Sequence, residues 1–169
     1  MRRRFVIAGT LLGGVLLSFL NWLTAALYKQ FRDPGAVVET IRANVSGNDI
    51  YTAPQGLFVS VSLRPGSAGG PQNFGARVVR QFTTEFVVAF GLSLLLLATA
   101  IRSPLSAAGF FGLVGLIAGI ETHFPNWNWA GFPTSDLLAG SGYLAANWCI
   151  VGLALGAARQ KLSPREDAG

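Results

Sequence analysis

The sequence contains few charged residues, and this shortage excludes an ordinary soluble domain. Only 12% of its 169 residues are charged, whereas soluble domains average about 25%. Cys149 is the only cysteine, so the chain cannot form an intramolecular disulfide or a cysteine metal cluster. His123 is the only histidine, which excludes bis-histidine haem ligation within one chain.

Signatures of common catalytic sites are missing as well. The chain has no GxSxG nucleophile elbow, no HExxH zinc motif, no P-loop and no GxGxxG dinucleotide motif. These absences favour a non-enzymatic protein. The sequence predicts no cofactor and no metal site.

Long apolar segments take the place of the missing charges. A helix that crosses a membrane needs about 20 apolar residues, and in lipid all its backbone groups must be paired internally. We predict an all-α membrane protein, a bundle of four transmembrane helices over residues 5–27, 82–101, 105–122 and 137–158, with residues 1–169 forming a single membrane domain. Because residues 5–27 exceed the apolar core of a signal peptide, we expect them to be a retained anchor.

Basic residues cluster at one set of helix ends and predict the orientation. They are Arg2, Arg3 and Arg4 before the first helix, Arg102 between the second and third, and Arg159, Lys161 and Arg165 after the fourth. The link 121–136 carries no Lys or Arg. By the positive-inside rule both termini are cytoplasmic, in a bacterial cytoplasmic (inner) membrane. The outer segment 28–81 holds the other six basic residues, Lys29, Arg32, Arg42, Arg64, Arg77 and Arg80. The positive charge is thus divided between two sides of the membrane, and we expect no nucleic-acid partner.

Residues 28–81 are the one long segment outside the membrane. Asp33-Pro34 is typical of a helix start, and an apolar stripe follows: Val37, Val38, Ile41 and Val45. Residues 50–53 and 57–63 predict a β-hairpin, in which Leu57, Val59, Val61 and Leu63 share one face. The segment predicts a small α+β extracytoplasmic cap, which is too small to be stable alone.

Ionisable side chains inside a membrane are costly and are functional candidates. The predicted topology brings four of them to one layer near the outer surface: Glu85, Glu121, His123 and Asp136. Such a layer suits a proton or ion relay, or a divalent cation held by carboxylate and imidazole. The alternative is structural, because acidic side chains stabilise helix N-termini and polar groups suit the interface.

The stretch before the fourth helix is rich in aromatic residues, namely Trp127, Trp129 and Phe132. Tryptophan and other aromatic residues are typical of the membrane interface. A second interpretation is an aromatic platform for a lipid, a quinone or a sugar.

Small residues predict close packing of the helices. Glycines four residues apart let helix backbones approach in lipid. Such pairs are Gly9/Gly13, Gly115/Gly119 and Gly152/Gly156. Their spacing does not distinguish packing within one chain from packing between copies. Asn147 in the fourth helix should form a hydrogen bond across the bundle, to Ser18, Asn21 or Ser93.

Three stretches carry a resemblance to other proteins: residues 48–54 (NDIYTAP), residues 126–133 (NWNWAGFP) and the pair Asn147-Trp148. Together with the helix layout, they resemble a family of small uncharacterised bacterial inner-membrane proteins with four helices and an outer segment between the first two. The resemblance implies the architecture and no reaction or ligand.

Several functions fit these patterns. The leading hypothesis is a non-enzymatic accessory or assembly subunit of a membrane complex. The first alternative is a small transporter or proton/ion relay that uses the outer carboxylates, and the second is a lipid- or quinone-handling membrane enzyme. The expected partners are the lipid bilayer and either other membrane subunits or further copies of this chain.

Overall fold

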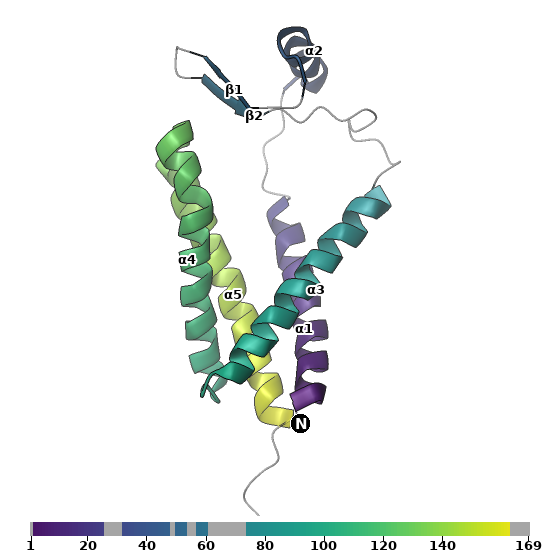
Figure 1. Ribbon diagram of the computed structural model, residues 1–169, viewed down its shortest axis with the longest axis vertical. Coiled ribbons are helices and arrows are strands. Elements are labelled where there is room, and N and C mark those ends of the chain that lie inside the picture. Colours follow the sequence, from purple (N-terminus) through teal and green to yellow (C-terminus); the bar gives the residue numbers. More distant parts are fainter. Residues whose placement is uncertain (1, 26–31, 48–49, 54–56, 61–73, 163–169) are drawn as a thin grey trace, which may run out of the picture.

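The computed structural model describes residues 2–25, 32–47, 50–53, 57–60 and 74–162 (Figure 1). Four helices are long and apolar enough to cross a membrane: α1 (Arg2–Ala25), α3 (Phe74–Ala98), α4 (Pro104–Ala130) and α5 (Thr134–Leu162). The segment between α1 and α3 contains the shorter helix α2 (Pro34–Asn44) and the strands β1 (Ile50–Ala53) and β2 (Leu57–Ser60). The chain is therefore a multi-pass membrane protein, and the prediction of four membrane helices is confirmed.

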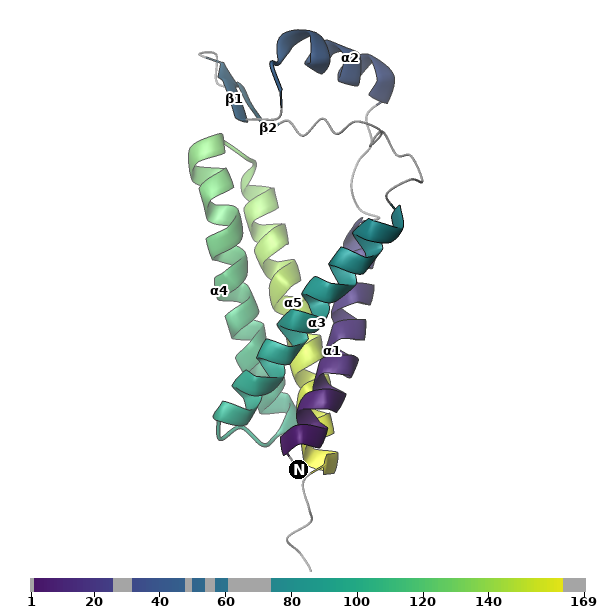
Figure 2. The same ribbon diagram turned by 45° about the vertical axis from the view of Figure 1, so that its right-hand side comes forward.

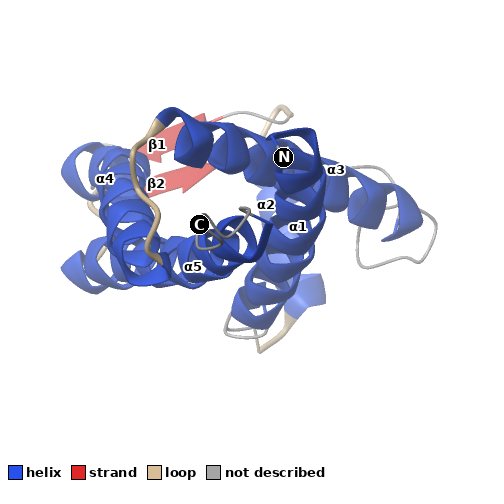
Figure 3. Cartoon of the chain, turned by 90° about the horizontal axis from the view of Figure 1, so that it is seen from below, coloured by secondary structure: helices blue, strands red, loops and turns tan. Residues whose placement is uncertain are grey.

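The membrane helices form two antiparallel pairs, α1 with α3 and α4 with α5, and the pairs meet mainly where α1 contacts α5. The pairs converge where α1 begins and α5 ends, and they separate toward the end that faces α2 and the hairpin (Figure 2). We call these the convergent end and the divergent end. Figure 3 shows the molecule from the convergent end.

The hydrophobic core lies mainly toward the convergent end, where all four helices contribute. Its buried side chains come from the start of α1, the end of α3, the start of α4 and the second half of α5: Phe5, Leu92, Leu96, Ala107, Phe111, Val151 and Leu155. Leu17 and Ala89 extend this core toward the middle of the α1–α3 pair. Many apolar side chains on the outer surfaces of the helices are exposed, as lipid-facing surfaces are.

The six glycines in the predicted pairs all lie at contacts between helices of this one chain. A Cβ atom on Gly119 would lie 2.6 Å from the Ser141 Cα atom, and one on Gly156 would lie 2.6 Å from the Pro104 Cα atom. A Cβ atom on Gly13 would lie 3.0 Å from the Ala89 Cβ atom. Glycine thus lets the backbones approach within each pair, as expected for helices in lipid.

Helix α4 is longer than the sequence pattern predicts, because it ends at Ala130 and not near residue 122. It begins with the Ser103 hydroxyl accepting from the Ser106 N–H, and with Pro104 in its first turn. It continues through Pro125, which cannot donate to a helical carbonyl. It ends at Gly131, whose φ of 67° is left-handed and whose N–H donates to the Asn126 carbonyl. Much of the predicted aromatic link is therefore helix.

The segment between α1 and α3 has helix and hairpin but no packed core of its own among the described residues. Helix α2 starts as predicted: the Asp33 side chain accepts from the Ala36 N–H at 2.9 Å, and Pro34 follows. Strands β1 and β2 pair antiparallel, with Tyr51 opposite Val59. No residue of α2 is buried, so a compact α+β cap is not supported. Residues 61–63 and the side chains of β2 lie outside the described part.

Candidate functional site

Glu85 of α3 is the only buried ionisable side chain in the described part of the chain, with 6% of its surface exposed. The Asn21 side chain of α1 donates from Nδ2 to Glu85 Oε1 at 2.6 Å. Gln81, one turn earlier in α3, donates from Nε2 to the same oxygen. No described Lys or Arg forms an ion pair with it. The site therefore holds a carboxyl group between two helices, where it can accept hydrogen bonds or take up a proton or cation.

Helix α5 brings further polar groups to the same depth. The Tyr143 hydroxyl donates to the Leu20 carbonyl of α1, and Val151 lies beside Gly13. Because α1 and α5 run antiparallel, these two contacts place Asn147 level with residues 16 and 17 of α1.

Asn147 does not form the hydrogen bond that we predicted for it. Its Nδ2 is buried and has no partner in the described structure, and the same holds for the Ser18 hydroxyl. The other two partners predicted for Asn147 form other hydrogen bonds: Asn21 donates to Glu85, and the Ser93 hydroxyl donates to the Ala89 carbonyl. Buried polar groups without partners are costly, so this part of the bundle is less stable than a fully paired one.

The other three candidate relay residues belong to the α4–α5 pair. The His123 imidazole lies directly against Gly140 of α5. Glu121 and Asp136 are exposed. Asp136 occupies the first turn of α5, where a carboxylate stabilises the positive end of the helix dipole.

The structure does not bring the four candidate relay residues together. Glu85 lies between α1 and α3, and the other three lie on the opposite pair, at the end where the pairs separate. Among the described residues, no group of three His, Cys, Asp or Glu side chains can hold a metal ion. Any chemistry of Glu85 thus depends on Asn21 and Gln81.

The aromatic residues do not form one platform. Trp127 donates from Nε1 to the Thr134 hydroxyl at 3.1 Å and so joins the end of α4 to the start of α5. Trp129 is 85% exposed, and residues two apart on a helix face different directions. Phe132 is also exposed. This distribution is typical of an aromatic belt at the membrane interface.

Arg159 has a structural role that the sequence pattern missed. Its guanidinium, in the last part of α5, donates to the Leu96 and Thr99 carbonyls and, at 2.8 Å, to the Ile101 carbonyl. The last carbonyls of a helix have no intrahelical donor, and a cation there also matches the helix dipole. Arg159 therefore caps α3 and joins the two pairs at the convergent end.

Three partners of the site were also not predicted. Gln81 lies four residues before Glu85, a spacing at which helical side chains meet, so the sequence did contain a signal. The other two contacts are the hydrogen bond from Asn21 to Glu85 and the one from Tyr143 to α1. A single sequence cannot predict them, because each depends on how two helices face each other.

Comparison of the chain with protein-family models, with characterised proteins and with solved structures gives no match. The resemblance to small bacterial four-helix inner-membrane proteins accordingly stays a prediction.

Proposed function

We propose that this protein is a non-enzymatic accessory or assembly subunit of a membrane complex. The observation that carries the proposal is that α2 has no buried residue. An isolated helix of 11 residues is only marginally stable in water, and so is an isolated two-stranded hairpin. These elements need a surface that the described part of the chain does not provide, and a partner subunit supplies one.

The side chains of α2 indicate which face meets the partner. Val37, Val38 and Ile41 are half-buried and lie on one stripe. Outside this stripe Glu39 and Arg42 are exposed and form an ion pair of 3.5 Å. A partner that covers the apolar stripe gains the most binding free energy, because burial of apolar surface is favourable.

The charge pattern supports an orientation in a bacterial inner membrane in which the N-terminus and the C-terminus are both cytoplasmic. Arg2–Arg4, Arg102 and Lys161 are exposed at the convergent end, and Arg159 lies there as well. By the positive-inside rule this end faces the cytoplasm, and α2 with the hairpin is extracytoplasmic.

Site-specific photocrosslinking in native membranes tests the proposal. A photoreactive residue at Val38 or Ile41 should give an adduct with one heterologous membrane protein, and one at Glu39 or Ala43 should not. Adducts with a second copy of this chain, or equal adducts from both faces, would contradict the accessory role.

The second candidate is a proton or ion relay, now centred on Glu85. A buried carboxyl group with two amide donors and no described cationic partner favours it. Protein reconstituted into liposomes should then carry a proton or cation flux that Glu85→Gln abolishes and Glu121→Gln leaves unchanged. A flux equal in wild type and Glu85→Gln would exclude this candidate.

A further inference from the structure

A groove follows the seam between α1 and α3 at the convergent end. Its volume is about 720 Å³, and its lining includes Arg2, Arg3, Val6 and Ile7 of α1 and Leu94 and Leu97 of α3. Ile7 and Leu94 are 62% and 44% exposed, so the groove opens toward lipid. One end of the groove is therefore cationic and the remainder is apolar.

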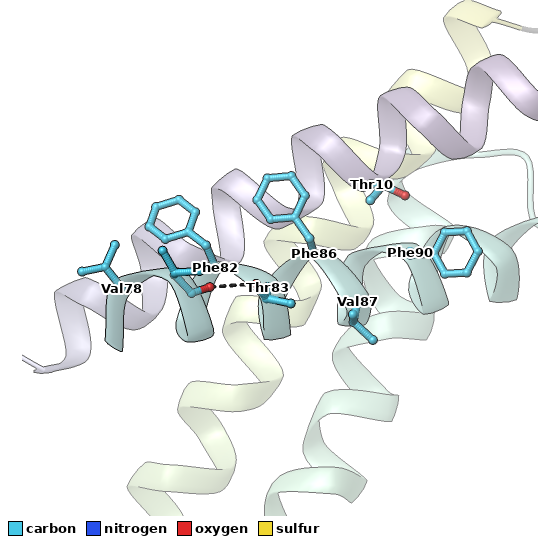
Figure 4. A pocket seen from close by; sticks show the side chains of 8 residues that line it. Thr10, Val78, Phe82, Thr83, Phe86, Val87 and Phe90 are labelled. Atoms are coloured by element: carbon cyan, nitrogen blue, oxygen red, sulfur yellow. Dashed lines mark hydrogen bonds between the residues drawn. The ribbon is translucent and has the colours of Figure 1, made fainter. Parts of the chain in front are cut away.

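A second groove lies further along the same helices, toward the divergent end (Figure 4). Thr10, Phe90 and Val87 are among its lining residues. Phe90 is four residues before Leu94 on α3, and Thr10 is three residues after Ile7 on α1, so these residues share one face of each helix. The two grooves thus lie one after the other along the same faces of α1 and α3, and we call them together the apolar track, which begins at the two arginines.

The dimensions of this track fit one leaflet of a bilayer. A leaflet contributes about 15 Å of hydrocarbon, half of the roughly 30 Å core. Ten residues of helix rise about 15 Å, so the distance from Arg3 to Gly13 spans one leaflet. An acyl chain whose headgroup lies at Arg3 would pass Ile7 and end near Thr10 and Phe90.

The charges at the start of the track match an anionic headgroup. Arg2 and Arg3 are exposed, and neither forms an ion pair with a described acidic residue. They lie in the first turn of α1, where backbone N–H groups lack intrahelical acceptors and the helix dipole favours negative charge. Guanidinium groups bind phosphate oxygens through paired hydrogen bonds.

We propose that this groove is a binding site for an anionic phospholipid of the leaflet at the convergent end. The phosphate and the anionic headgroup lie against Arg2 and Arg3. One acyl chain lies along Val6, Ile7, Leu94 and Leu97 and reaches the groove of Figure 4. This site is separate from the surface of α2 and does not depend on the accessory role.

Native mass spectrometry of the full chain tests the site. The protein is reconstituted in nanodiscs that contain equal phosphatidylglycerol and phosphatidylcholine, is then released in mild detergent, and the lipids bound to each chain are counted. The wild type should retain phosphatidylglycerol in preference to phosphatidylcholine. The double variant Arg2→Gln/Arg3→Gln should lower retained phosphatidylglycerol about tenfold.

Two controls distinguish a built site from general attraction to a negative membrane surface. Arg4→Gln/Arg102→Gln removes the same charge from exposed residues that do not line the groove, and should change retention by less than about twofold. Ala98→Phe narrows the groove without changing charge and should displace the lipid, whereas Ala100→Phe should not.

Three results would overturn the proposal. The first is an equal loss of bound phosphatidylglycerol in the two arginine double variants. The second is equal retention of phosphatidylglycerol and phosphatidylcholine by the wild type. The third is full retention of phosphatidylglycerol by Ala98→Phe. The arginines are exposed, so their substitution leaves the core unchanged, and the comparison between the double variants decides the question even if Ala98→Phe fails to fold.

Discussion

Glu85 and Arg159 are two side chains that join helices through polar contacts inside the bundle. Glu85 joins α1 to α3 by accepting from Asn21, and Arg159 joins α5 to the end of α3. Hydropathy predicted that Glu85, Glu121 and Asp136 lie within or at the edge of membrane helices. It did not predict their partners, because depth along a helix says nothing about which neighbour the helix turns that side chain toward.

Removal of the Glu85 carboxyl group should destabilise the contact between α1 and α3. Glu85→Ala leaves the amide groups of Asn21 and Gln81 without their acceptor, and we expect a loss of about 2 kcal/mol in the free energy of unfolding in detergent. Glu85→Gln keeps an acceptor oxygen and should lose less. Glu121→Ala, at an exposed position, should change stability by about 0.5 kcal/mol or less. Equal losses for Glu85→Ala and Glu121→Ala would show that Glu85 has no structural role.

Substitution of Arg159 should release the end of α3. Arg159→Met removes a charged donor from the Leu96, Thr99 and Ile101 carbonyls, with an expected loss of about 1.5–3 kcal/mol in the free energy of unfolding. Hydrogen exchange should increase in the residues around 95–103. Lys161→Met removes the same charge from an exposed position and serves as the control. Similar exchange in both variants would argue against the cap.

At the scale of elements, the four membrane helices were predictable and their ends were less so. A run of apolar residues fixes the existence of a membrane helix, because lipid leaves the backbone no other pairing. The end of α4 was missed because Pro125 and two asparagines interrupt the apolar pattern. Proline removes one helical hydrogen bond, to the Glu121 carbonyl, and the last turns of α4 then close on Gly131.

Two glycines of α4 offer a matched test of helix packing. A Cβ atom on Gly119 would meet the Ser141 backbone at 2.6 Å, while one on Gly109 would meet no atom within 4 Å. Gly119→Ala should therefore lower the free energy of unfolding by about 1–3 kcal/mol, because the helices must move apart. Gly109→Ala should be neutral or stabilising by up to about 1 kcal/mol. Thermal unfolding in detergent measures both, and an equal response would mean that Gly119 does not set the distance between α4 and α5.

At the scale of the whole molecule, two helix pairs are joined at the convergent end and separate toward α2. The prediction of a packed cap failed because an apolar stripe predicts a face to be covered without naming what covers it. The predicted relay layer failed for a similar reason. The sequence pattern assigned Glu85 and Asp136 to one layer, but it could not show that they belong to different helix pairs.

Cysteine labelling in intact cells tests the orientation of the two ends. In a background with Cys149→Ser, Ser46→Cys near α2 should react with a membrane-impermeant thiol reagent added outside, since the positive-inside rule predicts that α2 is extracytoplasmic. Gln160→Cys, near the end of α5, should react only after the membrane is made permeable. Both positions are exposed, so accessibility within the protein is matched. The reverse pattern of labelling would show that the protein has the opposite orientation in the membrane.

The central claim is that the apolar stripe of α2 binds a different subunit, and native mass spectrometry after mild detergent extraction tests it most directly. The wild type should carry one heterologous membrane protein. The variant Val38→Ser/Ile41→Ser should lose that protein, and Glu39→Ser/Ala43→Ser on the opposite face should retain it. A wild type found only as copies of this chain, or a partner retained by the stripe variant, would contradict the account.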